Sequence, residues 1–64
     1  MKGTIQWVRH YHFYNSECVD VMYESGRLYT WYDETIPNTI RKWMEGKEGR
    51  KQVDGLHGDE VIYE

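Results

Sequence analysis

The alternation of apolar and polar positions predicts two antiparallel strands near the start of the chain. In residues 4–14, "TIQWVRHYHFY", alternate side chains are apolar except at Arg9, and a period of two is typical of a strand. The turn residues "NSE" separate this segment from a second strand in "CVDVMYE", residues 18–24. The predicted core face of the two strands consists of Ile5, Trp7, Tyr11, Phe13, Val19, Val21 and Tyr23.

A tight hairpin is predicted to join the second strand to a third, "RLYTWY", residues 27–32. A two-residue loop at 25–26 suits the sequence, because Gly26 adopts a positive φ at little cost. This register assigns Leu28 and Tyr32 to the core face. The opposite face then receives, side by side, Met22, Tyr29, Asp20 and Trp31.

Residues 33–46, "DETIPNTIRKWMEG", carry the signals of a helix. Asp33 or Thr35 can cap its start, Pro37 is tolerated in the first turn, and Gly46 is a natural stop. One apolar stripe with helical spacing consists of Ile36, Ile40, Trp43 and Met44. The following "GKEGRKQ", residues 46–52, is expected to form an exposed, mostly basic loop, and only residues 61–63 of the tail are expected to form a strand.

These elements predict a single α+β domain over residues 1–64. Its sheet is a three-stranded antiparallel β-meander with one α-helix packed on one face. Residues 61–63 could add a short C-terminal edge strand, and residues 47–60 are otherwise loop and tail. A domain of 64 residues buries only about 60% of the surface that its unfolded chain exposes, so oligomerisation is a natural source of further stability.

The segment from Phe13 to Arg50 resembles the KTSC domain, a small module of bacteria and phages. The resembling motifs are Tyr14-Asn15 at the first turn, Val19 to Tyr23 in the second strand, Ser25-Gly26-Arg27 with Tyr29 and Trp31 in the hairpin, Ile36-Pro37 at the helix start, and Gly49-Arg50 in the loop. The resemblance implies a β-β-β-α order of elements and an accessory protein of bacterial or phage origin. It implies no defined activity.

Composition narrows the classes of function. The net charge of −3 has the wrong sign for a strong general nucleic-acid binder and is too small for a DNA mimic. The lone Cys18 excludes an internal disulfide and suits a reducing compartment. The chain contains no apolar run of membrane-spanning length and no signal-peptide core, so we expect a cytoplasmic protein without a membrane partner.

The predicted second face of the sheet is the candidate binding surface. Tyr29 and Trp31 form its centre, and its other members are Asp20, Met22, Arg27, His10 and His12. Tyrosine, tryptophan, methionine and arginine are enriched in protein interfaces, which favours a non-catalytic protein that binds a protein partner or itself. A small accessory or phage-encoded protein of this kind could inhibit a host component. Burial of the same face under the tail is the structural alternative.

Two further functions remain open from the sequence. An oligomer could bind a nucleotide or cyclic nucleotide by stacking on the aromatic side chains, with phosphate held by Arg27, Lys47, Arg50 and Lys51. Weak binding of RNA or single-stranded DNA is the second alternative. His10 and His12 with Asp20 or Cys18 do not complete a metal-ligand set, and no catalytic motif occurs, so we expect no cofactor, no metal and no enzymatic activity.

Overall fold

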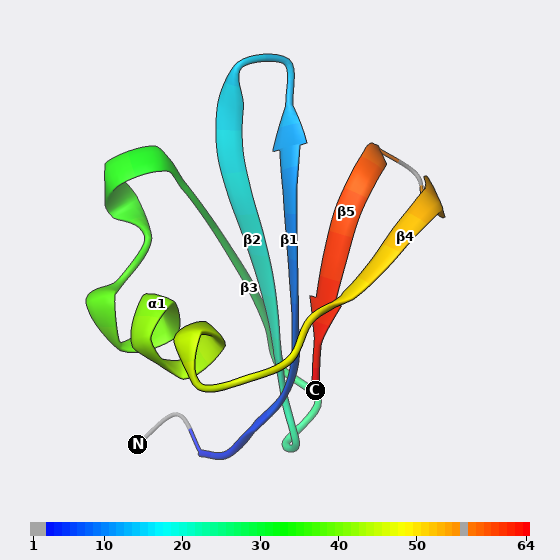
Figure 1. The fold of residues 1–64 in the computed structure, drawn as a ribbon. Coiled ribbons are helices and arrows are strands. Elements are labelled where there is room, and N and C mark those ends of the chain that lie inside the picture. The colour runs from blue at the N-terminus through cyan, green and yellow to red at the C-terminus, as the bar shows by residue number, and fades with distance from the viewer. Residues whose placement is uncertain (1–2, 56) are drawn as a thin grey trace.

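The computed structural model of the protein describes residues 3–55 and 57–64. These residues form one antiparallel sheet of five strands with strand order β3-β2-β1-β5-β4, together with one α-helix (Figure 1). The elements are β1 (Ile5–Phe13), β2 (Ser16–Tyr23), β3 (Leu28–Tyr32), a 3₁₀ helix (Asp33–Thr35), α1 (Asn38–Glu45), β4 (Arg50–Gly55) and β5 (Gly58–Tyr63). The predicted α+β fold with one helix on one sheet face is confirmed, and the predicted meander makes up three of the five strands.

The helix packs on the sheet through the predicted apolar stripe. Ile36 and Ile40 are buried in the core cluster, and Trp43 and Met44 pack against it. Pro37 occupies the N-cap position, and the Thr35 hydroxyl donates a hydrogen bond to the main-chain oxygen of Tyr32. With its eight residues, α1 is far too short to cross a bilayer, and the described part of the chain contains no helix that could.

The first hairpin differs from the prediction by a bulge. Ile5 pairs with Tyr23 but Trp7 pairs with Met22, so Gln6 is an extra residue in β1. One extra residue reverses the alternation of every side chain that follows it. Val8, predicted to face away from the helix, is therefore fully buried in the core. The prediction was wrong for three aromatic residues, which point to the other face: Trp7, Tyr11 and Phe13.

The loop between β2 and β3 is longer than predicted, and this shifts the register of β3. The Tyr23 N–H donates to the Arg27 carbonyl at 2.9 Å and the Gly26 N–H to the Tyr23 carbonyl at 2.9 Å, which closes a three-residue loop with Gly26 at φ 92°. A one-residue shift in register moves every side chain to the opposite face. Tyr29 and Trp31 consequently pair with Val21 and Val19 on the helix side.

Leu28 and Tyr32 show the consequence of this shift most clearly. They were predicted to lie in the core, yet they are 54% and 57% exposed on the face opposite the helix. Tyr29 and Trp31 were predicted to be solvent-facing, yet they pack against the core cluster. The assignment of the two faces of β3 was therefore wrong.

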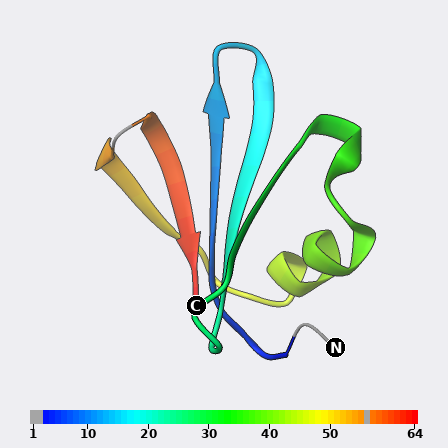
Figure 2. The same ribbon diagram turned by 180° about the vertical axis from the view of Figure 1, so that it is seen from behind.

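The C-terminal third of the chain forms a second hairpin rather than a loop and tail. β4 starts at Arg50, inside the segment predicted to be a basic loop, and β5 is longer than the predicted strand at 61–63. β5 pairs with β1 at Val8, Arg9 and His10, so it lies inside the sheet and β4 forms the edge. Figure 2 shows α1 and the β4–β5 hairpin on opposite sides of the central strands.

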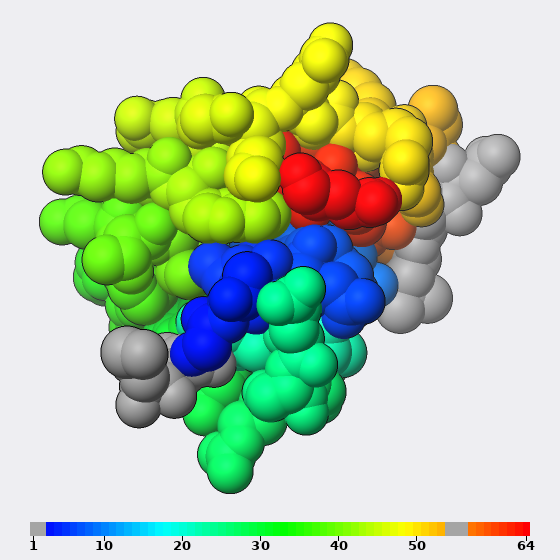
Figure 3. Space-filling model, turned by 90° about the horizontal axis from the view of Figure 1, so that it is seen from below, coloured from blue at the N-terminus to red at the C-terminus, as the bar shows by residue number. Residues whose placement is uncertain are grey.

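The segment that leads from α1 to β4 crosses the lower part of the sheet (Figure 1). Seen from below, the C-terminal residues lie between β1 and this segment (Figure 3). Gly49 sits in it so close to β5 that an added Cβ would lie 2.4 Å from Val61 Cγ1. The absence of a side chain at this position allows the chain to reach β4.

Candidate functional site

The sheet face opposite α1, called the helix-free face below, is organised as rows of side chains. The central row crosses all five strands of the described sheet, because Thr30, Asp20, Arg9, Ile62 and Arg50 are direct partners in successive strand pairs. A flanking row consists of Leu28, Met22 and Trp7, and another of Tyr32, Cys18 and Tyr11. A mostly polar row therefore runs between two largely apolar ones.

Asp20 is the centre of this face and is only 5% exposed. Its carboxylate accepts hydrogen bonds from the Arg9 guanidinium, with Nε at 3.1 Å, from the Tyr11 hydroxyl at 3.2 Å and from the Thr30 hydroxyl at 2.8 Å. Donors on both neighbouring strands thus satisfy a charge that would be costly to bury alone. Asp20 orders the centre of the sheet and has little capacity left for a ligand.

The electrostatics of the two neighbours follow from this carboxylate. Burial, the charge of Asp20 and their hydrogen bond raise the pKa of the Tyr11 hydroxyl, so this group stays protonated as a donor. Burial alone would lower the pKa of Arg9. The hydrogen bond and the charge of Asp20, together with the charge of Glu60, outweigh that effect and hold the pKa above its ordinary value. Arg9 is therefore a permanent cation in this face.

A pocket of about 290 Å³ opens beside Arg9. Its lining comes from β1, β4 and β5 and the chain end, and consists of Trp7, Arg9, Arg50, Gln52, Glu60, Ile62 and Glu64. Glu60 is only 4% exposed, and among the described residues its Oε2 atom has no hydrogen-bond partner. The nearest cation is Arg9, whose Nε lies 3.7 Å from that oxygen, too far for a hydrogen bond.

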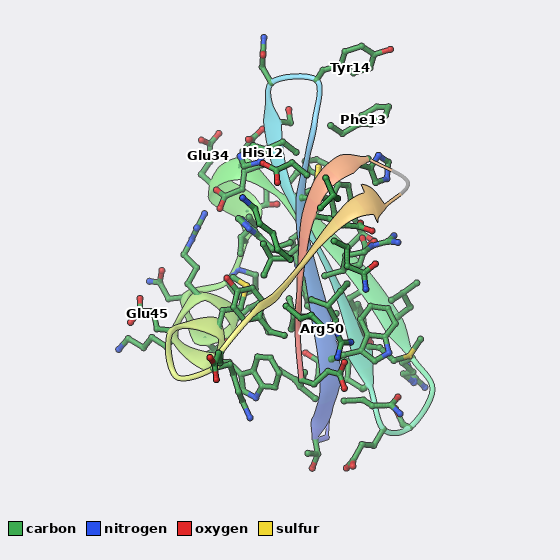
Figure 4. The ribbon with its side chains drawn as sticks, turned by 45° about the vertical axis from the view of Figure 1, so that its right-hand side comes forward. His12, Phe13, Tyr14, Glu34, Glu45 and Arg50 are labelled. Atoms are coloured by element: carbon green, nitrogen blue, oxygen red, sulfur yellow. The ribbon has the colours of Figure 1, made fainter. Side chains whose placement is uncertain are left out.

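Aromatic side chains gather at the upper end of the helix-free face. The rings of Tyr11 and His57 stack with centroids 4.3 Å apart, and Phe13 makes an edge contact with His57 at 5.5 Å. Tyr14, in the two-residue loop of the first hairpin, has φ 56° and is almost fully exposed. Figure 4 shows Phe13 and Tyr14 projecting to one side of the hairpin tip and His12 lying on the other, toward Glu34.

The structure does not bring the predicted binding residues together. Tyr29 and Trp31 stack on each other with centroids 5.5 Å apart on the helix side. The other members are dispersed: Asp20 and Met22 lie on the helix-free face, Arg27 follows the loop between β2 and β3, and His10 and His12 lie on the helix side of β1. A single surface made of these seven residues is therefore not present.

The four residues predicted to hold a phosphate are also dispersed. Lys47 Nζ lies over the Trp43 ring at 4.5 Å, and Lys51 pairs with Asp59 at 3.6 Å. Arg50 is paired with Glu64 and is the only one of the four that lines the larger pocket. Arg50 and Lys51 are adjacent in a strand, so their side chains point to opposite faces.

A second pocket, of about 260 Å³, lies on the helix side around Glu17. The Glu17 carboxylate accepts hydrogen bonds from Arg41 at 3.1 and 3.2 Å and contacts His10 Nε2 at 2.8 Å. The hydrogen bond from Arg41, followed by that from His10, lowers the pKa of Glu17 from 4.5 to about 2. This network ties α1 to the first hairpin.

The lowered pKa of Glu17 predicts a defined loss of stability in acid. A depressed folded-state pKa stabilises the fold above pH 4.5, and this stabilisation is lost as the pH falls from 4.5 through about 2. Because the carboxylate is partly exposed, solvent screening reduces the contribution to roughly 1 kcal/mol. We expect Glu17→Gln to have a lower urea midpoint than wild type at pH 6. At pH 2 the difference between the two midpoints should be smaller. Equal gaps at both pH values would contradict the assignment, and Glu34→Gln on the exposed 3₁₀ helix is the control.

The sequence analysis missed Glu60, Trp7 and Arg9 as members of one site. The sequence did mark Arg9, because this charged residue interrupts an otherwise apolar alternation. It marked Asp20 similarly, as a charged residue between two valines in "VDV". It did not mark Glu60, since the strand of this residue was expected to start only at residue 61. Among residues 3–55 and 57–64, no three histidine, cysteine or acidic side chains lie close enough together to hold a metal ion.

Comparison with protein-family models, with curated proteins and with solved structures found no match for this chain. The resemblance to the KTSC domain therefore stays a prediction.

Proposed function

We propose that this chain is a small non-catalytic binding protein that contacts a second copy of itself through the helix-free face. The observation that carries the proposal is the exposure of large apolar side chains on that face. Phe13 is 51% exposed, and Leu28 and Tyr32 are exposed to a similar degree. These three residues are called the contact patch below.

The composition of this face supports a protein contact. Its apolar rows contain tryptophan, tyrosine and methionine, which are enriched at interfaces, and its central acidic residue is already neutralised within the chain. Burying the face against a protein would therefore not leave the Asp20 charge unpaired. The contact patch contains none of the residues of the binding surface predicted from the sequence, whose centre, Tyr29 and Trp31, packs against the core on the helix side.

The small size of the core favours a second copy as the occupant. Among the described residues, the largest fully buried side chains are three valines, Val8, Val19 and Val21. A domain with so few fully buried side chains has little margin of stability, and oligomerisation is a common remedy at this size. Dimerisation through the contact patch would extend the hydrophobic core across the sheet.

Light scattering coupled to gel filtration tests this proposal. We expect wild type at about 100 µM to have the mass of a dimer, and the double variant Leu28→Glu/Tyr32→Glu to have the mass of a monomer with its fold retained, because charges in an apolar contact are strongly disfavoured. Val53→Glu, an exposed apolar residue of the edge strand β4, is the matched control and should stay dimeric. A monomeric wild type would refute self-association.

Nucleotide binding, the alternative from the sequence, has weaker support. The four basic residues assigned to phosphate do not line one pocket, and two carboxylates, Glu60 and Glu64, line the pocket that contains Arg50. An anionic ligand would meet these charges at short range.

A further inference from the structure

We propose that the pocket between Trp7 and Glu60 is a binding site for a guanidinium group. The inference rests on the charge, the burial and the shape of this pocket. The pocket lies over β1, β5 and β4 on the same helix-free face as the contact patch, but Leu28 and Tyr32 lie on β3, so the variant Leu28→Glu/Tyr32→Glu keeps every residue of its lining and allows the two proposals to be tested separately.

The charges around Arg9 do not balance. Two buried carboxylates, Asp20 and Glu60, face one guanidinium, so the group carries a net charge of −1. Arg9 directs both Nε and Nη2 to Asp20, and Glu60 Oε2 is left at 3.7 Å from Nε. A buried carboxylate oxygen without a donor is costly unless a partner arrives. A cation that carries hydrogen-bond donors would supply both a donor to Glu60 Oε2 and the positive charge that balances this group.

The pocket walls select a flat cation. Trp7 provides an indole ring and Ile62 an aliphatic surface, and a guanidinium stacks on aromatic rings while it donates along its edge. A carboxylate accepts two parallel N–H bonds from a guanidinium, which an ammonium cannot supply in the same geometry. The volume of about 290 Å³ is at the lower end of ligand pockets and suits a side-chain-sized group.

The rim adds a polar entrance. Arg50 and Glu64 pair there and are mostly exposed, and Gln52 lies beside them. The exposed Arg50–Glu64 pair contributes little stability and can rearrange when a ligand enters. A guanidinium could come from an arginine of a peptide or from a free small molecule, and the chemistry at Glu60 is the same in both cases.

Titration followed by two-dimensional NMR, with the indole N–H signal of Trp7 as the reporter, tests the site. The probes are the blocked tripeptide Gly-Arg-Gly, the same peptide with citrulline, which is nearly isosteric but neutral, the same peptide with lysine, and agmatine as a free guanidinium. We expect the arginine peptide to bind at least about tenfold more tightly than the citrulline peptide, as a charged hydrogen bond predicts. We also expect it to bind more tightly than the lysine peptide.

The comparison between probes shows whether the ligand is a small guanidinium compound or an arginine side chain, and it also shows whether the proposal fails. Agmatine binding as tight as that of the arginine peptide assigns the site to small guanidinium compounds, and tighter peptide binding assigns it to an arginine side chain. Two results would overturn the proposal. One is equal binding of the arginine and citrulline peptides, and the other is the absence of any shift of the Trp7 signal when each probe is present at about 10 mM.

Glu60→Gln provides a readout that a purely structural role would not give. The amide keeps the shape of the side chain and removes the uncompensated charge, so we expect guanidinium binding to be lost while the melting temperature stays equal or rises. If Glu60 instead served mainly to pair with Arg9, the variant would melt at a lower temperature, and that result would contradict the assignment. Glu34→Gln makes the same change of charge away from the pocket and should leave both binding and melting temperature unchanged.

Discussion

Asp20→Ala is expected to destabilise the protein more than any of the other single substitutions proposed for it, because Asp20 is a buried charge. The change removes the acceptor of Arg9, Tyr11 and Thr30 at once and leaves their donors at the centre of the sheet. Removing one partner of a buried ion pair costs about 3–5 kcal/mol. A domain of this size shifts its melting temperature by about 4–8 °C for each kcal/mol, so the variant should melt at least about 12 °C below wild type.

The expected loss for Asp20→Ala is near the lower bound because Arg9 has a second carboxylate within reach. Glu60 Oε2 lies 3.7 Å from Arg9 Nε, and a small movement of the guanidinium would pair them. The same Asp20→Ala change in a Glu60→Gln background should therefore cost more than in wild type. A double-mutant cycle from urea unfolding measures this coupling.

Asp59→Ala is the matched control for Asp20→Ala. Asp59 also pairs with a basic residue, Lys51 at 3.6 Å, but both side chains are largely exposed. Exposed pairs contribute about 0–1 kcal/mol, so this variant should melt close to wild type. If the two alanine variants had equal melting temperatures, the network around Asp20 would not be the structural centre of the helix-free face.

Local sequence signals were sufficient to predict α1 and β2, whose apolar patterns are strong. The helix stripe with a proline at the start and a glycine at the end predicted where α1 packs, and Ile36 and Ile40 are in the core as expected. The alternation in residues 18–24 predicted β2 and the burial of Val19 and Val21. In both elements the period of the apolar residues and the residues that begin and end the segment predict the same secondary structure, and the observed burial agrees with it.

Alternation alone could not show which faces of β1 and β3 lie toward the helix. A bulge at Gln6 and one additional residue in the loop before Arg27 each shift the register by one position. In β3 either register buries a ring, because Tyr29 and Trp31 lie on one face and Tyr32 on the other. In β1 the rings of Trp7, Tyr11 and Phe13 share one face, and the bulge turns Val8 into the core instead. Only the pairing with β2 decides which rings are buried, and that pairing depends on loop geometry that differs by a single residue.

The site was missed for a different reason. Its pocket joins residues 7–9 to residues 50–64, and the second of these segments has little apolar alternation. β4 reads "RKQVDG", a polar sequence that is typical of an edge strand and hard to distinguish from a loop. Without β4 and β5 the sheet ends at β1, and Glu60 cannot be placed beside Arg9.

Gly49→Ala is expected to have the second-largest effect on stability, because this glycine fixes the entry into β4. An added Cβ would lie 2.4 Å from Val61 Cγ1 and 2.8 Å from Tyr63 Cε1, both in β5. Relieving such contacts requires the loop or the side chains of Val61 and Tyr63 to move, and overpacking of this kind costs about 1–3 kcal/mol. Arg50 follows directly, so a movement of the loop would also displace it from the pocket rim. Thermal unfolding and the NMR shift of the Trp7 indole N–H measure the two effects.

Gly46→Ala separates a steric effect from the general loss of a glycine. At Gly46 the backbone has φ −84°, and the nearest atom to an added Cβ is the Trp43 carbonyl oxygen at 3.9 Å. An alanine there fits without strain and restricts the unfolded chain, so stability should be unchanged or rise by about 0.4–1 kcal/mol. If Gly49→Ala and Gly46→Ala unfolded at the same temperature, the close packing of the loop on β5 would be wrong. The path that brings Arg50 beside Trp7 and Glu60 would then lose its physical basis.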